Sequence, residues 1–211
     1  MVRSTITNMM VINASANAGK IDLLQNLKPI GGVQFDYLKS TNVSAVYYAV
    51  DSGFNNYKIK KGDVEFANLL LNNTSNNVSL WVYDSLSVST VKYLLLNDKL
   101  DTPGRAKAKV RYLFLSPDMD TVNVTRADTV SLYVNASYYK TQLQVDNGGL
   151  AAFVPVDTGN AVIKFVPINT SSAIKTYQHH FSSNAIYTFV IKGYRQRAGA
   201  DSLSLSIIKH N

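Results

Sequence analysis

Histidine is the first residue type to consider for chemistry in this chain of 211 residues, because imidazole binds metals and transfers protons near neutral pH. His179 and His180 are adjacent, and His210 lies next to the C-terminus, where we expect a flexible end. Neighbouring residues of a strand point to opposite faces, so His179 and His180 are not expected to bind one metal ion. We predict that His179 and His180 are ordinary loop or strand histidines.

Asp118 and Asp120 form the other candidate metal site, because alternate oxygen ligands in a loop can converge on Ca²⁺. A Ser-Pro-Asp turn explains Asp118 without a metal, through a side-chain hydrogen bond to the backbone. We favour the turn and predict no metal site.

Other chemistry finds little support in the sequence. Cysteine is absent, which excludes thiolate nucleophiles, thiolate metal sites and disulfides. No nucleophile elbow, phosphate loop, dinucleotide fingerprint or His-Glu-x-x-His motif occurs, and the acidic residues are scattered. We therefore predict no enzyme, no catalytic residues and no cofactor.

Basic residues are the most distinctive charged feature, in a chain whose formal net charge is +7. Arg105, Lys107, Lys109 and Arg111 alternate, so an extended strand would place them on one face. Such a stripe could bind acidic polysaccharide, lipid head groups or a protein. The alternative, which we favour, is that the stripe guards an edge strand against association. Nucleic acid is not expected, because no nucleic-acid-binding module is visible.

Aromatic residues give a second candidate binding surface. Trp81 and Tyr83 are out of phase with Val78, Leu80 and Val82, so a strand that buries those aliphatic residues turns both rings outward. Outward rings could stack on sugars. We favour the alternative, that they pack against another domain or a loop, because a large exposed apolar group usually has a partner.

The elements that must position these residues are predicted to be strands. Period-2 alternation recurs along the chain and is separated by turn clusters rich in Gly and Asn. Antiparallel β-sandwiches of immunoglobulin-like type fit this spacing. Residues 63–70 and 172–179 could form short helical turns. The alternation also predicts a set of buried residues: Val78, Leu80, Val82, Val122, Val124, Leu203, Leu205 and Ile207.

An internal repeat organises the chain. An apolar run ending at Ser15 resembles one ending at Ser116, and the turn at Gly53 resembles that at Gly159, a period of roughly 100 residues. That period suits a whole domain. We predict two tandem domains, residues 1–100 and 105–211, whose short turn-rich link keeps them in contact.

The second half carries a family resemblance. Residues 108–118 read Ala-Lys-Val-Arg-Tyr-Leu-Phe-Leu-Ser-Pro-Asp, and Val-Asn-Val follows at 122–124, with Asp-Thr-Gly at 157–159 and Tyr-Thr-Phe at 187–189. This pattern resembles a domain-of-unknown-function family of secreted bacterial immunoglobulin-like β-sandwiches, more closely in the second half than in the first. Phe114 and Asn123 depart from the family, where His and Asp are frequent. The match of Arg111 to the motif implies a structural ion pair.

The resemblance implies export, to the periplasm, outer membrane or cell surface of Gram-negative bacteria, often as a lipoprotein. Residues 1–5 do not resemble a signal peptide, so we expect the signal segment, and any lipid-bearing Cys, to be missing from this sequence. We predict a non-catalytic binding or adhesion module for glycan or protein, with Trp81, Tyr83, Arg105, Lys107 and Lys109 as candidate binding residues. The alternative is a structural subunit or spacer of an envelope assembly.

Overall fold

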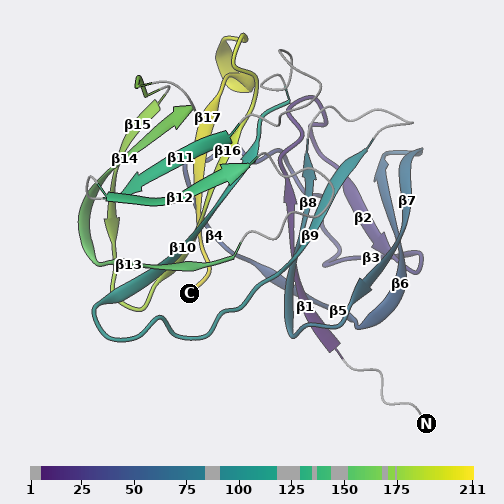
Figure 1. Ribbon diagram of the computed structural model, residues 1–211. Helices are drawn as coiled ribbons and strands as arrows, with labels where there is room; N and C mark the ends of the chain where they lie inside the picture. Colours follow the sequence, from purple (N-terminus) through teal and green to yellow (C-terminus); the bar gives the residue numbers. More distant parts are fainter. Residues whose placement is uncertain are drawn as a thin grey trace.

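The computed structural model describes residues 6–83, 91–117, 129–134, 137–143, 152–167, 171–173 and 175–211, with the backbone alone at 129–134, 137–143, 167, 175 and 200. Strands account for nearly all regular structure in these ranges (Figure 1). The all-β prediction is therefore confirmed. Within the same ranges, no helix is long and apolar enough to cross a lipid bilayer.

The first half of the chain forms two sheets, shown on the right of Figure 1. We call them outer sheet 1, ordered β3-β2-β6-β7, and inner sheet 1, ordered β5-β1-β8-β9. Their strands are β1 (Ile6–Asn13), β2 (Asp22–Gln25), β3 (Lys28–Pro29), β5 (Tyr47–Asp51), β6 (Gly53–Lys61), β7 (Val64–Asn73), β8 (Asn77–Tyr83) and β9 (Lys92–Asn97).

The second half forms the two sheets on the left of Figure 1. Inner sheet 2 is ordered β13-β10-β16-β17-β4, and outer sheet 2 is ordered β12-β11-β14-β15. Their strands are β10 (Lys107–Leu115), β11 (Thr129–Val134), β12 (Ser137–Leu143), β13 (Val154–Asp157), β14 (Gly159–Pro167), β15 (Lys175–Phe181), β16 (Ile186–Lys192), β17 (Ser204–Lys209) and β4 (Asn42–Ser44). A short 3₁₀ helix, Gly199–Asp201, precedes β17.

The two halves follow one topology. In each inner sheet one pair, β1 with β8 or β10 with β16, is parallel, and the strands on either side of that pair are antiparallel to it. Inner sheet 2 has a further parallel pair at its edge, between β17 and β4. The parallel pairs differ from the expected all-antiparallel sandwich. They are possible because each pair is joined by a long connection that passes through the outer sheet. β4 also crosses the expected boundary, since it comes from the first half and pairs with β17.

Equivalent landmarks occupy equivalent places in the two halves. Ser15 and Ser116 are both fully buried just beyond β1 and β10. Gly53 and Gly159 begin β6 and β14 with φ of 88° and 112°, a backbone region that favours glycine. The sequence repeat thus corresponds to the same positions in the two sets of strands.

The sheets stack in four layers, with a core between each neighbouring pair. Inner strands are buried on both faces, which explains the continuous apolar runs of the sequence. Met9, Val11, Ile21, Leu23, Tyr57, Ile59, Val78, Leu80 and Val82 are among the residues that fill the first sandwich. Val110, Tyr112, Phe114, Ile163, Phe165, Phe181, Tyr187, Phe189, Leu205 and Ile207 are among those that fill the second.

A third core joins the two inner sheets, and we call it the interlayer core. Its buried residues are Met10, Ile12, Ala14, Leu38, Trp81, Tyr83, Leu94, Leu96, Leu113, Leu115, Val190 and Ile208. Because it contains residues of both halves, the two sandwiches are packed against each other across their inner sheets. The surface between them therefore contains a cluster of buried apolar side chains of its own.

The alternation correctly predicts most of the core. Val78, Leu80, Val82, Leu203, Leu205 and Ile207 are all buried, whereas Val122 and Val124 lie outside the described residues. The helical turns expected at 63–70 and 172–179 are wrong. β7 and β15 cover most of those segments, because pairing with β6 and β14 outweighs local helix propensity.

Replacing Leu205 by Ala tests the core of the second half. Leu205 is buried, so the lost contacts and the resulting cavity are expected to lower the free energy of unfolding by about 2–5 kcal/mol. Urea denaturation gives the value. Val46→Ala, at an exposed residue between β4 and β5, serves as the control and should stay within about 0.5 kcal/mol. Equal effects for the two variants would contradict the assignment of the core.

Candidate functional site

A buried ion pair lies at one end of the interlayer core. Arg111 belongs to β10, and Asp98 directly follows β9, so the pair joins the two halves of the chain. The Arg111 Nη1 and Asp98 Oδ1 atoms are 2.7 Å apart, and both side chains are completely buried. The orientation at Nη1 does not satisfy a hydrogen bond, so this contact is electrostatic. It confirms the structural ion pair expected for Arg111.

Ser79 connects the ion pair to the aromatic part of the interlayer core. Its hydroxyl donates to Asp98 Oδ1 at 3.0 Å and accepts from Arg111 Nη2 at 3.1 Å and from Trp81 Nε1 at 2.9 Å. One donor and two acceptor positions are therefore used, which is the full capacity of a serine hydroxyl. The indole nitrogen of Trp81 also gains the partner that a buried N–H needs.

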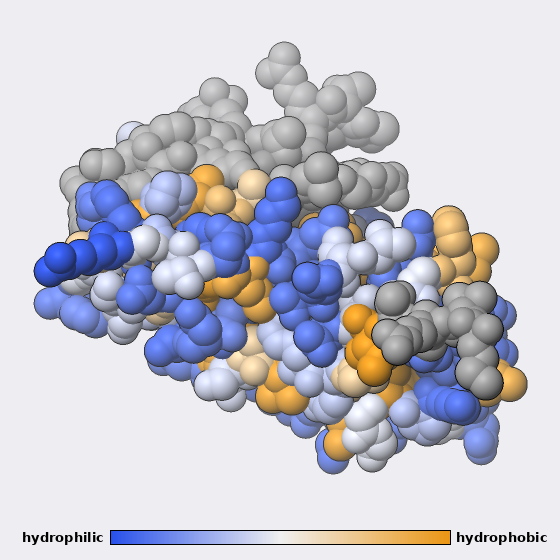
Figure 2. All heavy atoms as spheres, turned by 90° about the horizontal axis from the view of Figure 1, so that it is seen from below, coloured by the Kyte–Doolittle hydropathy of each residue, from blue (hydrophilic) through white to orange (hydrophobic). Residues whose placement is uncertain are grey.

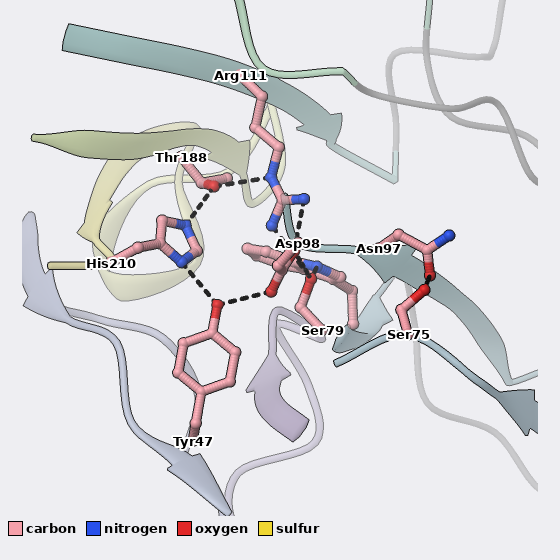
Figure 3. Close-up of polar contacts among 9 residues, drawn as sticks. Tyr47, Ser75, Ser79, Asn97, Asp98, Arg111, Thr188 and His210 are labelled. Atoms are coloured by element: carbon pink, nitrogen blue, oxygen red, sulfur yellow. Dashed lines mark hydrogen bonds and ion pairs between the residues drawn. The ribbon is translucent and has the colours of Figure 1, made fainter. Parts of the chain in front are cut away.

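Three further side chains close a ring of hydrogen bonds, as Figure 3 shows. Arg111 Nε donates to Thr188 Oγ1 at 2.8 Å, and Thr188 Oγ1 is 2.7 Å from His210 Nε2. His210 Nδ1 is 2.8 Å from the Tyr47 hydroxyl, which donates to Asp98 Oδ2 at 2.7 Å. We call Arg111, Asp98, Ser79, Thr188, His210 and Tyr47 the interlayer polar cluster.

The ring has a single consistent direction of donation. The one hydroxyl proton of Tyr47 is used by Asp98, so His210 must donate from Nδ1 to Tyr47. Nε2 then accepts from Thr188, whose oxygen accepts from Arg111. This arrangement requires a neutral imidazole, because a second N–H would leave the Thr188 proton without its acceptor.

The electrostatics of the cluster agree with a neutral His210. Burial, followed by the charge of Arg111, lowers the pKa of His210 to about 4, although Asp98 acts in the opposite direction. Burial and the Asp98 carboxylate raise the pKa of Tyr47 far above its usual value. Both side chains are therefore neutral at physiological pH, and the charges that remain are those of Arg111 and Asp98.

Phe153, the residue directly before β13, covers the cluster. The Arg111 Cζ atom lies 4.5 Å from the centre of the Phe153 ring, and the His210 ring lies 5.5 Å from it, edge to face. The polar atoms of the cluster are thus occupied by one another and shielded by aromatic carbon. This arrangement suits a structural junction rather than catalysis.

A second buried charge lies at the other end of β16. Lys192 is 1% exposed, its Nζ donates to Ser204 at 3.0 Å, and it lies 4.9 Å from the centre of the Tyr37 ring. Burial lowers the pKa of Lys192 to about 8. β16 therefore presents Thr188, Val190 and Lys192 to inner sheet 1, with the aliphatic residue between the two polar ones.

The structure places Trp81 and Tyr83 inside the interlayer core, where they are 0% and 5% exposed. Their orientation away from Val78, Leu80 and Val82 was predicted correctly. They face the other half of the chain, so neither ring is available to stack on a sugar.

The basic stripe is not the surface that its spacing suggests. Lys107 pairs with Asp157 at 2.6 Å, Lys109 pairs with Asp101, and Arg111 is buried, while Arg105 is exposed in the turn before β10. The interpretation as a guarded edge is wrong, because β10 lies between β13 and β16. The paired carboxylates also offset much of the charge that an anionic ligand would meet.

The histidines occupy three different environments. On β15, the His179 ring packs edge to face against Phe181, Tyr187 and Phe189, whereas His180 contacts the exposed Asn160 side chain at 2.8 Å. Their opposite orientation is as predicted. The expectation of a flexible terminus at His210 is wrong, because this residue extends β17 into the polar cluster.

No group of three potential metal-binding side chains occurs among the described residues. Asp118 and Asp120 lie outside those residues. Sequence reasoning missed Tyr47, Ser79, Asp98, Thr188 and His210 as members of one cluster. For His210 a signal existed, since the alternation of β17 continues through Ser206 and Ile208 to His210 on the interlayer face.

The strand arrangement and the buried cluster define a β-sandwich protein with a structural polar junction. Comparison with protein families matches residues 7–125 to the "Domain of unknown function (DUF4397)". Since the match covers more than half of the chain, the protein belongs to this family. The match begins within β1, includes β2 to β9 and continues through β10. No curated protein matches the chain significantly.

Replacing Asp98 by Asn tests the ion pair. The substitution leaves the Arg111 charge buried without its counter-ion, so the free energy of unfolding at pH 7 should fall by about 3–5 kcal/mol. Urea denaturation measures the loss. The double variant Arg111→Met with Asp98→Asn removes both charges and should lose less than Asp98→Asn alone. Asp157→Asn, at the exposed Lys107 pair, should cost less than about 1 kcal/mol.

The pH dependence of unfolding tests His210. Its pKa is about 4 in the folded protein and 6.5 in the unfolded chain, so the unfolded state binds more protons between these values. The contribution of His210 to the free energy of unfolding is therefore fully present above pH 6.5. It should decrease by about 2 kcal/mol from pH 7 to pH 4.5, because His210 must be protonated in the unfolded chain first.

His210→Asn should remove this share of the pH dependence, whereas His180→Asn, at an exposed histidine, should retain it. Identical pH profiles for wild type and His210→Asn would show that His210 is not held neutral by the cluster.

Proposed function

We propose that the protein is a non-catalytic interaction module of the bacterial cell envelope, built from two copies of one immunoglobulin-like β-sandwich. The repeated strand order and the equivalent Ser and Gly landmarks support two copies. The resemblance of residues 108–118 to a family of secreted proteins supports export. Protein or carbohydrate at the envelope is the proposed partner class.

The interlayer core is the observation that carries this proposal. Trp81, Tyr83 and the interlayer polar cluster are buried between the two halves and hold them together. These side chains therefore contribute to rigidity instead of ligand binding. The surfaces left for partners are the outer sheets, their edges and the loops. The face shown in Figure 2 is mostly hydrophilic, with hydrophobic residues in separate groups between the polar ones.

A structural subunit or spacer of an envelope assembly is the second candidate. The same core favours it, because two sandwiches packed across a dozen buried apolar side chains hold their outer sheets at a fixed separation. The two candidates differ in what the outer surfaces contact, which is a ligand in the first case and other subunits in the second.

Cell fractionation and co-sedimentation test the proposal. We expect the native protein in the envelope fraction of its host, and the purified protein should sediment with envelope fragments from the same cells. Protease treatment of the fragments should abolish retention if the partner is protein, and periodate should do so if it is carbohydrate. A cytosolic location, or a protein that stays in the supernatant with untreated fragments, would overturn the proposal.

A further inference from the structure

Strand β7 forms an unusually long edge of outer sheet 1. It spans ten residues, Val64–Asn73, and pairs with β6 alone among the described strands. Figure 1 shows β7 at the right-hand margin of the molecule, with no other strand beyond it. Its second side therefore presents backbone N–H and C=O groups that can pair with another strand.

The other sheet edges are short or protected, whereas β7 is neither. β3 has two residues and contains Pro29, and β13 has four residues and contains Pro155. β4 has three residues and β5 has five residues. The remaining edge strands, β9, β12 and β15, each contain a lysine: Lys92, Lys140 and Lys175. Natural proteins use such short strands, prolines and lysines to prevent edge-to-edge pairing. β7 contains no proline, lysine or arginine, and Glu65 is its one charged residue.

The C-terminal part of β7 is also regular enough to pair. Its register with β6 is continuous from Ala67 to Asn73, and the irregularity lies at the other end, between Ile59 and Lys60 of β6. Leu70 is 71% exposed on the outer face, and Phe54, its diagonal neighbour on β6, is 73% exposed. An apolar outer surface thus accompanies the unprotected edge.

We propose that β7 pairs antiparallel with β7 of a second copy of this chain, joining two outer sheets into one. The sequence of β7 is self-complementary about Leu69. In that register the regular residues 67–71 of the two copies pair with one another, and Leu70 faces Asn68 of the second copy. Glu65 lies beyond the irregularity, toward the uncharged end of the partner strand at Asn73, so no like charges oppose each other. The two Leu70 side chains become diagonal neighbours across the new contact, next to Phe54 of each copy. A two-fold axis through Leu69 relates the copies and closes the assembly as a dimer.

Sedimentation velocity of the purified protein over a range of concentrations tests this pairing. We expect a reversible monomer–dimer equilibrium for the wild type. Leu70→Lys should weaken the dimer by about tenfold or more, because a lysine on each copy guards the edge and the two charges lie close together. Val162→Lys is the matched control, since it adds the same charge at an exposed apolar position of β14, which lies inside its sheet.

Hydrogen exchange provides a second readout that does not depend on the variants. Amides of β7 should become more protected as concentration rises, while those of β9, another edge strand, should not change. A wild type that stays monomeric, a dimer that Leu70→Lys leaves intact, or protection that appears elsewhere would each overturn the pairing. The inference goes beyond the proposed function and is independent of it, because purified protein is used and cellular location does not enter the result.

Discussion

The buried ion pair between Arg111 and Asp98 is the constraint on which the arrangement of the two halves depends. Apolar contacts of the interlayer core are non-directional and tolerate sliding of one sheet over the other. The ion pair does not tolerate such sliding, because separating the guanidinium from the carboxylate would leave each charge buried without a partner, at a cost of several kcal/mol. The ring of hydrogen bonds through Thr188, His210 and Tyr47 adds a geometric constraint, since each donated proton has one acceptor in one position. We interpret the cluster as the element that specifies the register between the inner sheets, while the apolar residues supply most of the stabilisation.

Burial of the inner sheets on both faces follows from the same arrangement. In an ordinary two-layer sandwich each strand alternates, with one apolar and one polar face. Here β1, β8, β10 and β16 are apolar on both faces, and polar residues occur on the interlayer face mainly at its ends, at the Arg111 cluster and at Lys192. Two sandwiches with such faces would aggregate if they were separated. The packing of one against the other removes this hazard and makes the two halves one structural unit.

The sequence predicts local features well and long-range pairing poorly. Alternation located the strands and most of the core, and the phase of Trp81 against Leu80 indicated a second apolar face on β8. The position of β10 could not be found in this way, because the order of strands in a sheet depends on contacts between residues far apart in the chain. Lys107 and Lys109 therefore suggested an edge where a central strand exists. The family motif indicated an ion pair for Arg111, but Asp98 lies in a turn-rich segment with no pattern to mark it as the partner.

The distribution of aromatic residues shows how the fold limits where binding can occur. The chain has 13 tyrosines, a composition often found at adaptable binding surfaces, yet several of them are buried in structural roles. Tyr47 closes the polar cluster, Tyr57 accepts a hydrogen bond from Gln25 inside the first sandwich, and Tyr187 packs on His179 in the second. Composition alone therefore overstates the aromatic surface available to a ligand.

The exposed apolar side chains lie elsewhere, and Phe54 and Leu70 are the two most exposed ones on β6 and β7. An interaction module with this architecture must bind through its outer sheets, their edges or its loops, because the facing surfaces of the inner sheets are already used to hold the two halves together.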